Sequence, residues 1–256
     1  MKTKNNFQKN IIKRTHDTLY LKENNYDNPK QIHSFILKTI ISNLNLKNIK
    51  DYRGIITDFG PANGELLYNI KKKLPNAKLI GVEVLKDLVR KSKKKFLKEE
   101  NIKILLGSIL DKKILKPKSN DISIACGVLS IFDDFEKFIN NMIYFSKKGG
   151  KVYIAALFNN YPMDVYIKYK ESKNYNKKYQ ESGWNIFSKN SVSNFLNKKR
   201  NIKKFYFKDF NIDINIKKNN NDYLRSWTFK DIAGKRITTN GLSIILPTSL
   251  LCIELK

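Results

Sequence analysis

The sequence has little of what marks several large classes of protein. Its 256 residues include two cysteines and two histidines, and they are too far apart to show the ligand spacing of a metal site. We therefore predict no metal ion, and free thiols in a reducing, cytoplasmic location. No apolar run reaches the ~20 residues that a membrane-spanning helix needs. The lysine-containing N-terminus has no apolar run behind it, so no secretory signal is expected.

Acidic residues are scarce beside basic ones. The chain has 50 Lys and Arg against 23 Asp and Glu, which gives a formal net charge of +27. Such a field favours an anionic partner: a nucleic acid, a membrane surface or a small acidic molecule. However, almost all of the basic residues are lysine, and a coding bias toward A and T would also produce this excess of lysine, asparagine and isoleucine. The chain has no RGG tract and no stacked aromatic motif of RNA-binding proteins, so we favour a small anionic acceptor, with nucleic acid as the alternative.

One short segment, Asp58-Phe59-Gly60-Pro61-Ala62-Asn63-Gly64, carries the most information. It follows an apolar run at 55–56 that predicts a buried strand, and it precedes a stretch at 66–74 with helical spacing of apolar residues. The Gly-x-Gly-x-x-Gly pattern of dinucleotide-binding proteins is absent. An acid at the end of the strand, Asp58, suits a ligand with a positive group such as an ammonium or a sulfonium. The glycines allow that ligand to lie against the backbone.

A second acid ends the next apolar run. Glu83 follows Leu79 to Val82, about twenty residues beyond the glycine turn. In doubly wound folds, an acid at this position accepts hydrogen bonds from the ribose hydroxyls of a nucleotide cofactor. The two segments together predict a nucleotide-type ligand at the carboxyl ends of two strands.

These two segments, with others that follow, resemble the class I S-adenosylmethionine-dependent methyltransferases, over roughly residues 50 to 157. The other matching segments are Ile104 to Ile109 (third strand and adenine-contact loop), Asp121 to Leu129 (fourth strand), 130–134 after it, and Lys148 to Ala155 (turn into the fifth strand). Ser108 stands where many members of the family have an aspartate that accepts from the adenine amino group. A hydroxyl can accept the same hydrogen bond.

The resemblance implies a cofactor, its binding residues and a fold. The cofactor is S-adenosyl-L-methionine, and the product is S-adenosyl-L-homocysteine. The implied cofactor-binding residues are Asp58, Gly60, Pro61, Gly64, Glu83, Ser108, Ile109 and Cys126. The implied fold is α/β, a doubly wound, mostly parallel sheet of seven strands in a Rossmann-like arrangement.

The domain organisation follows from the fold. We predict a helical N-terminal cap at 1–50, with a helix that starts at Asn28-Pro29, and a methyltransferase domain at 51–256. Two inserts interrupt this domain: the first insert, at about 158–188, is polar and rich in tyrosine, and the second insert is at about 217–247. We also predict a capped helix at 188–197, a strand at 204–214 and a last strand at 250–255 that pairs with it.

Methyl transfer to a hydroxyl needs a group that removes its proton. The candidates for this catalytic role are His16 on the N-terminal segment, and Asp133 or Asp134 after the fourth strand. The candidates for acceptor binding are Tyr161, Arg225, Trp227, Arg236 and Asn240, because fork donors beside aromatic rings suit a sugar or a phosphate.

Two nucleic-acid methyltransferase classes lack their motifs here. The Asn/Asp-Pro-Pro-Tyr/Phe motif of amino-methylating enzymes is replaced by Cys126-Gly127-Val128-Leu129, and no Pro-Cys loop for cytosine C5 methylation is present. The segment 128–134 resembles small-molecule methyltransferases, including those of bacterial surface-polysaccharide biosynthesis. We expect O-methylation of a small anionic metabolite or glycan precursor. The alternatives are an RNA methyltransferase and a non-catalytic scaffold that binds the cofactor.

Overall fold

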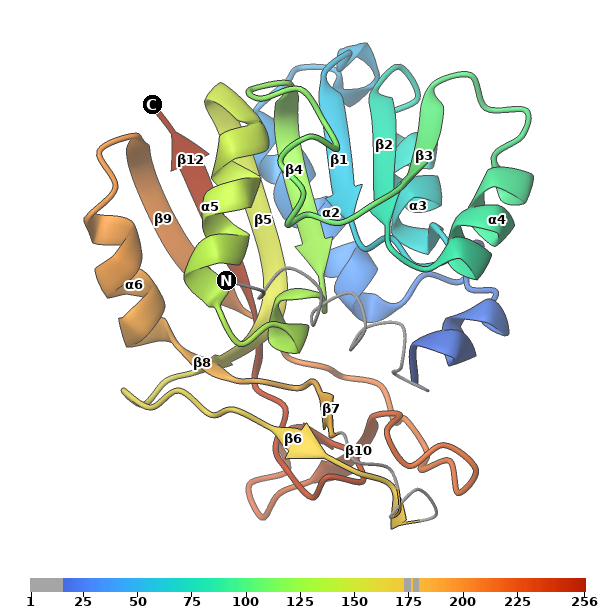
Figure 1. Cartoon of the computed structure of the whole chain (residues 1–256), viewed down its shortest axis with the longest axis vertical. Helices are drawn as coiled ribbons and strands as arrows, with labels where there is room; N and C mark the ends of the chain where they lie inside the picture. Colours follow the sequence, from blue (N-terminus) through green and yellow to red (C-terminus); the bar gives the residue numbers. More distant parts are fainter. Residues whose placement is uncertain (1–15, 173–175, 177–179) are drawn as a thin grey trace.

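The computed structural model describes residues 16–172, 176 and 180–256. The first fifteen residues of the predicted cap, and Tyr175 and Tyr179 of the first insert, lie outside the described residues. In the described part, a central sheet has the strand order β3-β2-β1-β4-β5-β12-β9 (Figure 1). The strands are β1 Ile55–Phe59, β2 Lys78–Glu83, β3 Ile102–Leu106, β4 Asn120–Cys126, β5 Ser146–Asn159, β9 Ile202–Asp209 and β12 Thr248–Leu255.

The strands β1 to β5 run parallel, and β12 runs antiparallel to both of its neighbours, β5 and β9. The short strand β8 (Phe187–Ser188) pairs with the end of β5 outside this row. The prediction of a mostly parallel, seven-stranded doubly wound sheet is therefore confirmed.

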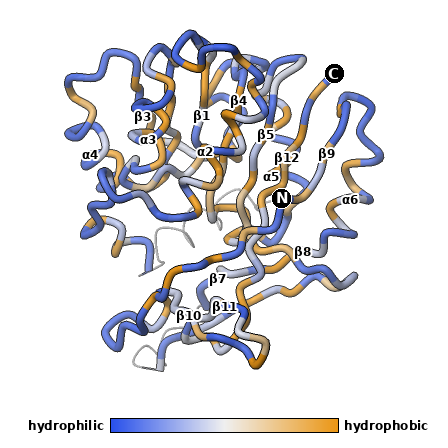
Figure 2. Tube along the Cα trace, turned by 180° about the vertical axis from the view of Figure 1, so that it is seen from behind, coloured by the Kyte–Doolittle hydropathy of each residue, from blue (hydrophilic) through white to orange (hydrophobic). Residues whose placement is uncertain are grey.

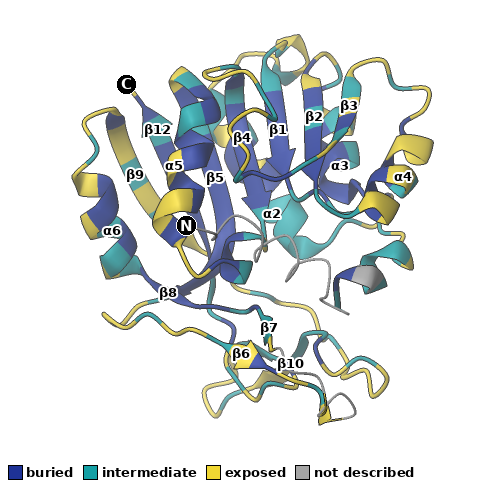
Figure 3. Ribbon diagram, in the orientation of Figure 1, coloured by how far each residue is buried: buried dark blue, intermediate teal, exposed yellow. Residues whose placement is uncertain are grey.

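Helices cover both faces of the sheet, and each face has its own apolar core. One core joins the sheet to α2 (Gln31–Leu44), α3 (Glu65–Lys73) and α4 (Lys86–Lys95), while the other joins it to α5 (Phe135–Phe145) and α6 (Lys189–Asn197). The strands between the helices are apolar, and the connecting loops are hydrophilic (Figure 2). Because both faces are covered, the central strands are buried along most of their length (Figure 3), as expected for a parallel sheet.

The first long helix starts later than predicted. Helix α2 begins at Gln31, and Lys30 occupies the N-cap position without a side-chain cap, so the prediction of Asn28 as N-cap and Pro29 as first helical residue was wrong. The Lys30 ammonium lies 2.5 Å from a Glu23 carboxylate oxygen and 3.6 Å from one of Glu65. Its backbone is extended, with φ −54° and ψ 142°. The pair with Glu65 joins segments that are distant in sequence, which the local Asn-Pro pattern does not encode.

The later elements follow the prediction with shifted ends. Ser188 caps α6, because its hydroxyl accepts a hydrogen bond from the Asn190 backbone N–H at 3.0 Å. Strand β9 ends at Asp209 rather than at 214, and β12 begins at Thr248. Beyond Asp209 the chain leaves the sheet and enters the second insert.

The two inserts form a separate layer beyond the carboxyl ends of β1 and β4 (Figure 1). Its short strands are β6 Lys168–Tyr169, β7 Glu181–Ser182, β10 Trp227–Lys230 and β11 Arg236–Thr239. The fully buried Asn185 attaches the first insert to the loop after β4, because its amide donates to the Phe132 carbonyl (2.8 Å) and to Asp133 (2.9 Å). None of the helices in the described residues is both long and apolar enough to span a membrane.

Candidate cofactor and acceptor site

The turn between β1 and α3 depends on two glycines in the left-handed region. Gly60 has φ +79° and Gly64 has φ +86°, a conformation that glycine adopts without steric cost. Space is also restricted: a Cβ on Gly60 would lie 2.4 Å from Cγ2 of Val128, and one on Gly64 would lie 2.5 Å from the Phe96 ring. Backbone hydrogen bonds fix the turn, from Gly60 N–H to the Val82 carbonyl and from Gly64 N–H to the Pro61 carbonyl, both at 2.8 Å. The turn therefore offers bare backbone at the carboxyl edge of the sheet.

Asp58 is a buried acid with an unmet hydrogen-bonding oxygen. The residue is 1% exposed, and its Oδ1 atom has no hydrogen-bond partner among the described residues. Burial, and then the nearby charge of Glu83, raises the pKa of Asp58 to about 8. An unpaired buried carboxylate is unfavourable unless a cation or donors reach it. The ammonium group of a ligand fits this requirement.

Glu83 at the end of β2 is held in a fixed orientation. One of its oxygens accepts from the Ala62 N–H at 3.0 Å, and the other accepts from the N–H groups of Val84 (2.8 Å) and Leu85 (3.0 Å). Burial raises the pKa of Glu83 to about 7, although these three backbone bonds act to lower it. A carboxylate has about four acceptor positions, so the Glu83 carboxylate can still accept from a ligand hydroxyl. Its role toward a ribose remains a prediction.

The other predicted cofactor-binding residues do not all lie at the carboxyl edge of the sheet. Buried Ser108 uses its hydroxyl to accept from the Leu110 N–H at 3.1 Å, and Pro61 is buried inside the turn. Cys126 ends β4, the strand next to β1. The Ile109 side chain lies in the core on the α5 side of the sheet. The structure therefore brings Asp58, Glu83 and Cys126 to one edge of the sheet, and places Ile109 in the packing behind that edge.

The N-terminal segment, residues 16–30, is tied to the turn after β1. It contains the 3₁₀ helix η1 (His16–Leu21). The Tyr26 hydroxyl donates to the Asn63 carbonyl at 2.7 Å, and the Asn25 backbone N–H donates to Glu65 at 2.7 Å. The Lys91 ammonium of α4 donates to the carbonyls of Leu21 and Glu23, at 2.8 and 2.6 Å. Sequence reasoning missed these contacts because backbone carbonyls have no sequence signature.

The same segment also contacts the second insert. A guanidinium nitrogen of Arg225 donates to Glu23 at 2.6 Å, and another donates to Asp222 at 2.9 Å. Burial acts to raise the pKa of Glu23, but the cations Lys30 and Arg225 outweigh it and hold that pKa below its usual value. His16 Nδ1 lies 3.7 Å from an Asp222 oxygen. The N-terminal segment therefore bridges the cofactor turn and the second insert.

The three predicted catalytic residues have different surroundings. His16 packs edge-on against Trp184, at 5.2 Å between ring centres. Asp133 is exposed and accepts from the Lys168 ammonium at 2.6 Å and from Asn185 at 2.9 Å. Asp134 caps α5 by accepting from the Lys137 N–H at 2.8 Å. Both aspartates are therefore engaged in contacts within the protein, with Lys168 and Asn185 for Asp133 and with the start of α5 for Asp134.

The predicted acceptor-binding residues differ in exposure and in their partners. Tyr161 is 73% exposed, and Arg225 is occupied by Glu23 and Asp222. The Arg236 guanidinium lies within 3.2 Å of an Asn215 oxygen. Trp227 and Asn240, by contrast, line the same hollow in the second insert.

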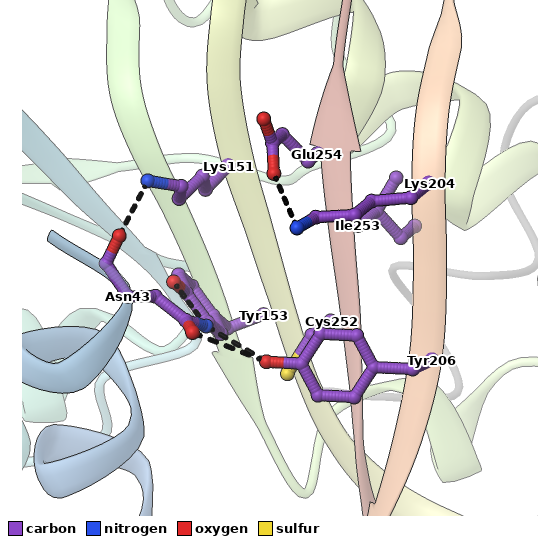
Figure 4. A pocket seen from close by; sticks show the side chains of 8 residues that line it. All are labelled: Asn43, Lys151, Tyr153, Lys204, Tyr206, Cys252, Ile253 and Glu254. Atoms are coloured by element: carbon purple, nitrogen blue, oxygen red, sulfur yellow. Dashed lines mark hydrogen bonds and ion pairs between the residues drawn. The ribbon is translucent and has the colours of Figure 1, made fainter. Parts of the chain in front are cut away.

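Another hollow, with a volume of about 80 Å³, lies on the sheet face formed by β5, β12 and β9 (Figure 4). It is smaller than the hollow in the second insert. Its polar groups satisfy one another: the Asn43 amide donates to the hydroxyls of Tyr153 (3.1 Å) and Tyr206 (2.9 Å), and Lys151 donates to the Asn43 carbonyl (2.7 Å). These residues lie away from the carboxyl edge, so we assign this hollow to packing between α2 and the sheet.

Fold and site together define an α/β domain that holds a nucleotide-type cofactor at the carboxyl edge of its sheet. A family model described as a methyltransferase domain matches residues 51–222. The chain therefore belongs to this methyltransferase family, and it is a class I, S-adenosyl-L-methionine-dependent methyltransferase, as predicted. No curated protein matches the chain.

Solved structures are similar to the chain at low sequence identity, and the first two named here share its fold. A putative methyltransferase of Haloferax volcanii, solved with the Trm112 methyltransferase activator, is 12% identical, with a TM-score of 0.59 over 94% of this chain and 98% of that one. Phosphoethanolamine N-methyltransferase 2 of Haemonchus contortus, solved with S-adenosyl-L-methionine, is 14% identical, with a TM-score of 0.54 over 80% of this chain and 46% of that one. A putative S-adenosyl-L-methionine-dependent methyltransferase of Methanococcus maripaludis is 19% identical, with a TM-score of 0.45 over 56% of this chain and 64% of that one. The chain thus spans less than two thirds of the length of the last two proteins.

Removal of the Glu83 carboxylate should weaken cofactor binding strongly. Glu83→Ala leaves donors at the site without an acceptor, and we expect a loss of about 2 to 4 kcal/mol in S-adenosyl-L-methionine binding, the range for charged hydrogen bonds left unmade. Isothermal titration calorimetry would measure it, with the exposed Glu100→Ala as the control that should bind normally. Glu83→Ala with wild-type affinity would rule out the ribose role.

The raised pKa of Asp58 predicts an opposite effect of pH on stability and on binding. The folded-state value of about 8 lies above the ordinary value of 3.8, so the folded, ligand-free protein holds this proton more tightly than the unfolded chain does. The resulting stabilisation is complete below about pH 4 and is lost as the pH rises through about 8. Cofactor affinity should instead rise over this range, by at most about tenfold per pH unit, because only ionised Asp58 pairs with a cation.

Asp58→Asn tests both effects, because it removes the charge and keeps the shape. The variant should make the ligand-free protein more stable to urea near pH 8 and should bind S-adenosyl-L-methionine more weakly. Its pH dependence should be flatter, with the remaining slope due to Glu83. If urea midpoints and calorimetry gave the wild-type slopes, Asp58 would not be the titrating group.

Proposed function

We propose that the chain transfers a methyl group from S-adenosyl-L-methionine to a hydroxyl group of a small anionic acceptor. The acceptor class is a sugar or phospho-compound of the kind used as a surface-glycan precursor. The observation that carries the proposal is the His16–Asp222 pair, 3.7 Å apart, where the N-terminal segment meets the second insert. The pair lies in the part of the molecule beyond the carboxyl ends of the strands, where open α/β sheets bind their ligands.

The cofactor half of the proposal rests on three residues. The unmet Oδ1 of buried Asp58 suits the ammonium of the methionine part of the cofactor. Glu83, oriented by three backbone N–H groups, suits a ribose hydroxyl, and Gly60 allows the cofactor to approach the backbone. The residues present therefore fit the cofactor that the family implies.

The proposed chemistry needs little from the protein besides alignment and proton removal. S-adenosyl-L-methionine supplies an electrophilic methyl group that its sulfonium charge has already activated. His16 accepts the proton of the attacking hydroxyl, and the Asp222 carboxylate stabilises the imidazolium that forms, as carboxylates do beside catalytic histidines. Arg225 holds Asp222 in place through its bond at 2.9 Å.

The test is a transfer assay with methyl-labelled cofactor and fractionated cell extract. We expect label in small molecules that an anion exchanger retains, with modest dependence on salt. Label in RNA, falling steeply between about 50 and 200 mM salt, would instead support the RNA alternative, which the net charge of +27 favours. Cofactor binding without transfer to any fraction would support the scaffold alternative.

A further inference from the structure

The larger hollow lies in the second insert and has a volume of about 390 Å³. This volume falls within the usual range of small-molecule sites, about 300 to 1,000 Å³. Three stretches of chain form it: the loop before β10, the strands β10 and β11, and the turn after β11. The lining includes Lys218, Tyr223, Trp227, Thr239, Asn240 and Ser243.

Asn240 lines this hollow and carries a buried donor that none of the described residues uses. The residue is 1% exposed, and its Oδ1 accepts from the Leu242 N–H at 3.0 Å. This bond fixes the orientation of the amide, so Nδ2 is the donor, and Nδ2 has no hydrogen-bond partner in the described residues. A buried donor without a partner is unfavourable, and the oxygen of a ligand would satisfy it.

The turn that carries Asn240 is fixed by its own hydrogen bonds. The Gly241 N–H donates to the Tyr223 carbonyl at 2.6 Å, and the Ser243 N–H donates to the Asn240 carbonyl at 3.0 Å. A Cβ on Gly241 would lie 2.5 Å from the Tyr223 carbonyl oxygen, so this close approach requires glycine. The position of the Asn240 amide is therefore set by the fold before any ligand binds.

The other residues that line the hollow favour a ligand of a particular charge and shape. The exposed Lys218 ammonium lies 5.1 Å from the centre of the half-buried Trp227 ring. Thr239 and Ser243 add hydroxyls, and no carboxylate is among the residues that line the hollow. Donors, a cation and an aromatic face favour a flat or cyclic molecule that carries an acidic group.

We propose that this hollow binds the acidic end of the methyl acceptor, a ring compound with a carboxylate or phosphate. Lys218 and Asn240 Nδ2 would bind the acidic group, and Trp227 would contact the ring. Tyr223 in the wall is the neighbour of Asp222, which lies beside His16. This adjacency in sequence is the link between the hollow and the proposed base. The role as acceptor site rests on the proposed function, whereas the binding itself does not.

The two tryptophans, Trp184 and Trp227, allow a test that needs neither cofactor nor turnover. In ¹⁵N-labelled full-length protein, each indole N–H gives its own NMR signal, and Trp227→Phe assigns them. Phenyl phosphate should shift the Trp227 signal in a saturable way and leave the Trp184 signal in place. The uncharged benzyl alcohol should bind at least about tenfold more weakly, because Lys218 would lose its partner.

Variants separate this site from general attraction to a basic protein. Lys218→Gln should weaken phenyl phosphate binding by about tenfold, whereas the neighbouring exposed Lys217→Gln should not change it. Asn240→Asp keeps the acceptor for Leu242 but replaces the donor with a negative charge, so it should abolish binding in a folded protein.

Three results would overturn the proposal: equal shifts of both indole signals, equal affinity for benzyl alcohol, or an unchanged affinity in Lys218→Gln. A short RNA that shifts the Trp227 signal at lower concentration than phenyl phosphate would assign the hollow to nucleic acid instead. Saturable anion binding without any methyl transfer would leave the site in place and remove the proposed function alone.

Discussion

Gly60→Val should reduce S-adenosyl-L-methionine binding by about two orders of magnitude or more. A side chain at φ +79° is strained, and its Cβ would lie 2.4 Å from the Val128 side chain. The left-handed conformation costs roughly 1 to 2 kcal/mol, and overpacking costs about 1 to 3 kcal/mol more. Relief of this strain requires the turn or the Val128 side chain to shift, at the place where a cofactor would lie. Calorimetric titration of the folded variant measures the loss.

Gly149→Val is the matched control for backbone strain. Gly149 has φ +70°, but a Cβ there meets no atom within 4 Å. The control shares the conformational cost without the steric block, and it lies at the start of β5, far from the cofactor turn in the fold. It should lose some stability and keep its affinity. If folded Gly60→Val bound the cofactor as tightly as Gly149→Val does, the assignment of this turn to cofactor binding would be wrong.

His16→Asn should lower kcat by about 10²- to 10⁴-fold, the usual contribution of a general base. Asparagine keeps a polar group of similar size beside Asp222 but cannot take the proton of the acceptor. Cofactor affinity should stay unchanged, since His16 is assigned to the acceptor side of the site. The measurement is the initial rate of methyl transfer, together with calorimetry on the same preparation.

His33→Asn is the natural comparison, because the chain has two histidines and His33 lies in α2. Burial, followed by the charge of Lys30, lowers the pKa of His33 to about 4, so this residue is neutral at ordinary pH and has no proposed part in the chemistry. Its variant should keep most of the activity. Equal rates for His16→Asn and wild type would leave alignment of the acceptor as the main source of catalysis.

The sequence predicted those parts of the fold that local patterns encode. Apolar runs and the turn chemistry at 58–64 predicted the order of strands and helices, and the two acids lie at the strand ends where doubly wound folds bind cofactors. Ser188 was correctly identified as a helix cap, because its hydroxyl bonds within its own turn. These signals extend over a few residues, so a single sequence contains them.

The parts that were missed depend on contacts between distant residues. Helix α2 starts at Gln31, and Lys30 before it pairs with Glu65 on another helix. Lys91 holds backbone carbonyls of the N-terminal segment, and a carbonyl is present at every residue. Arg225 was assigned to the acceptor, but the structure shows it paired with Glu23, 202 residues away. The sequence shows where an arginine is, but it does not show which distant residue the arginine pairs with.

The attachment of residues 16–30 to both halves of the site has a kinetic consequence. Tyr26 and Asn25 contact the cofactor turn, while Glu23 and His16 contact the second insert. A ligand that enters or leaves between these halves requires the contacts of residues 16–30 to break first. Segment motions of this kind often limit turnover. We therefore expect release of S-adenosyl-L-homocysteine, rather than methyl transfer itself, to be the rate-limiting step in the steady state. The first turnover should then show a burst of methylated product.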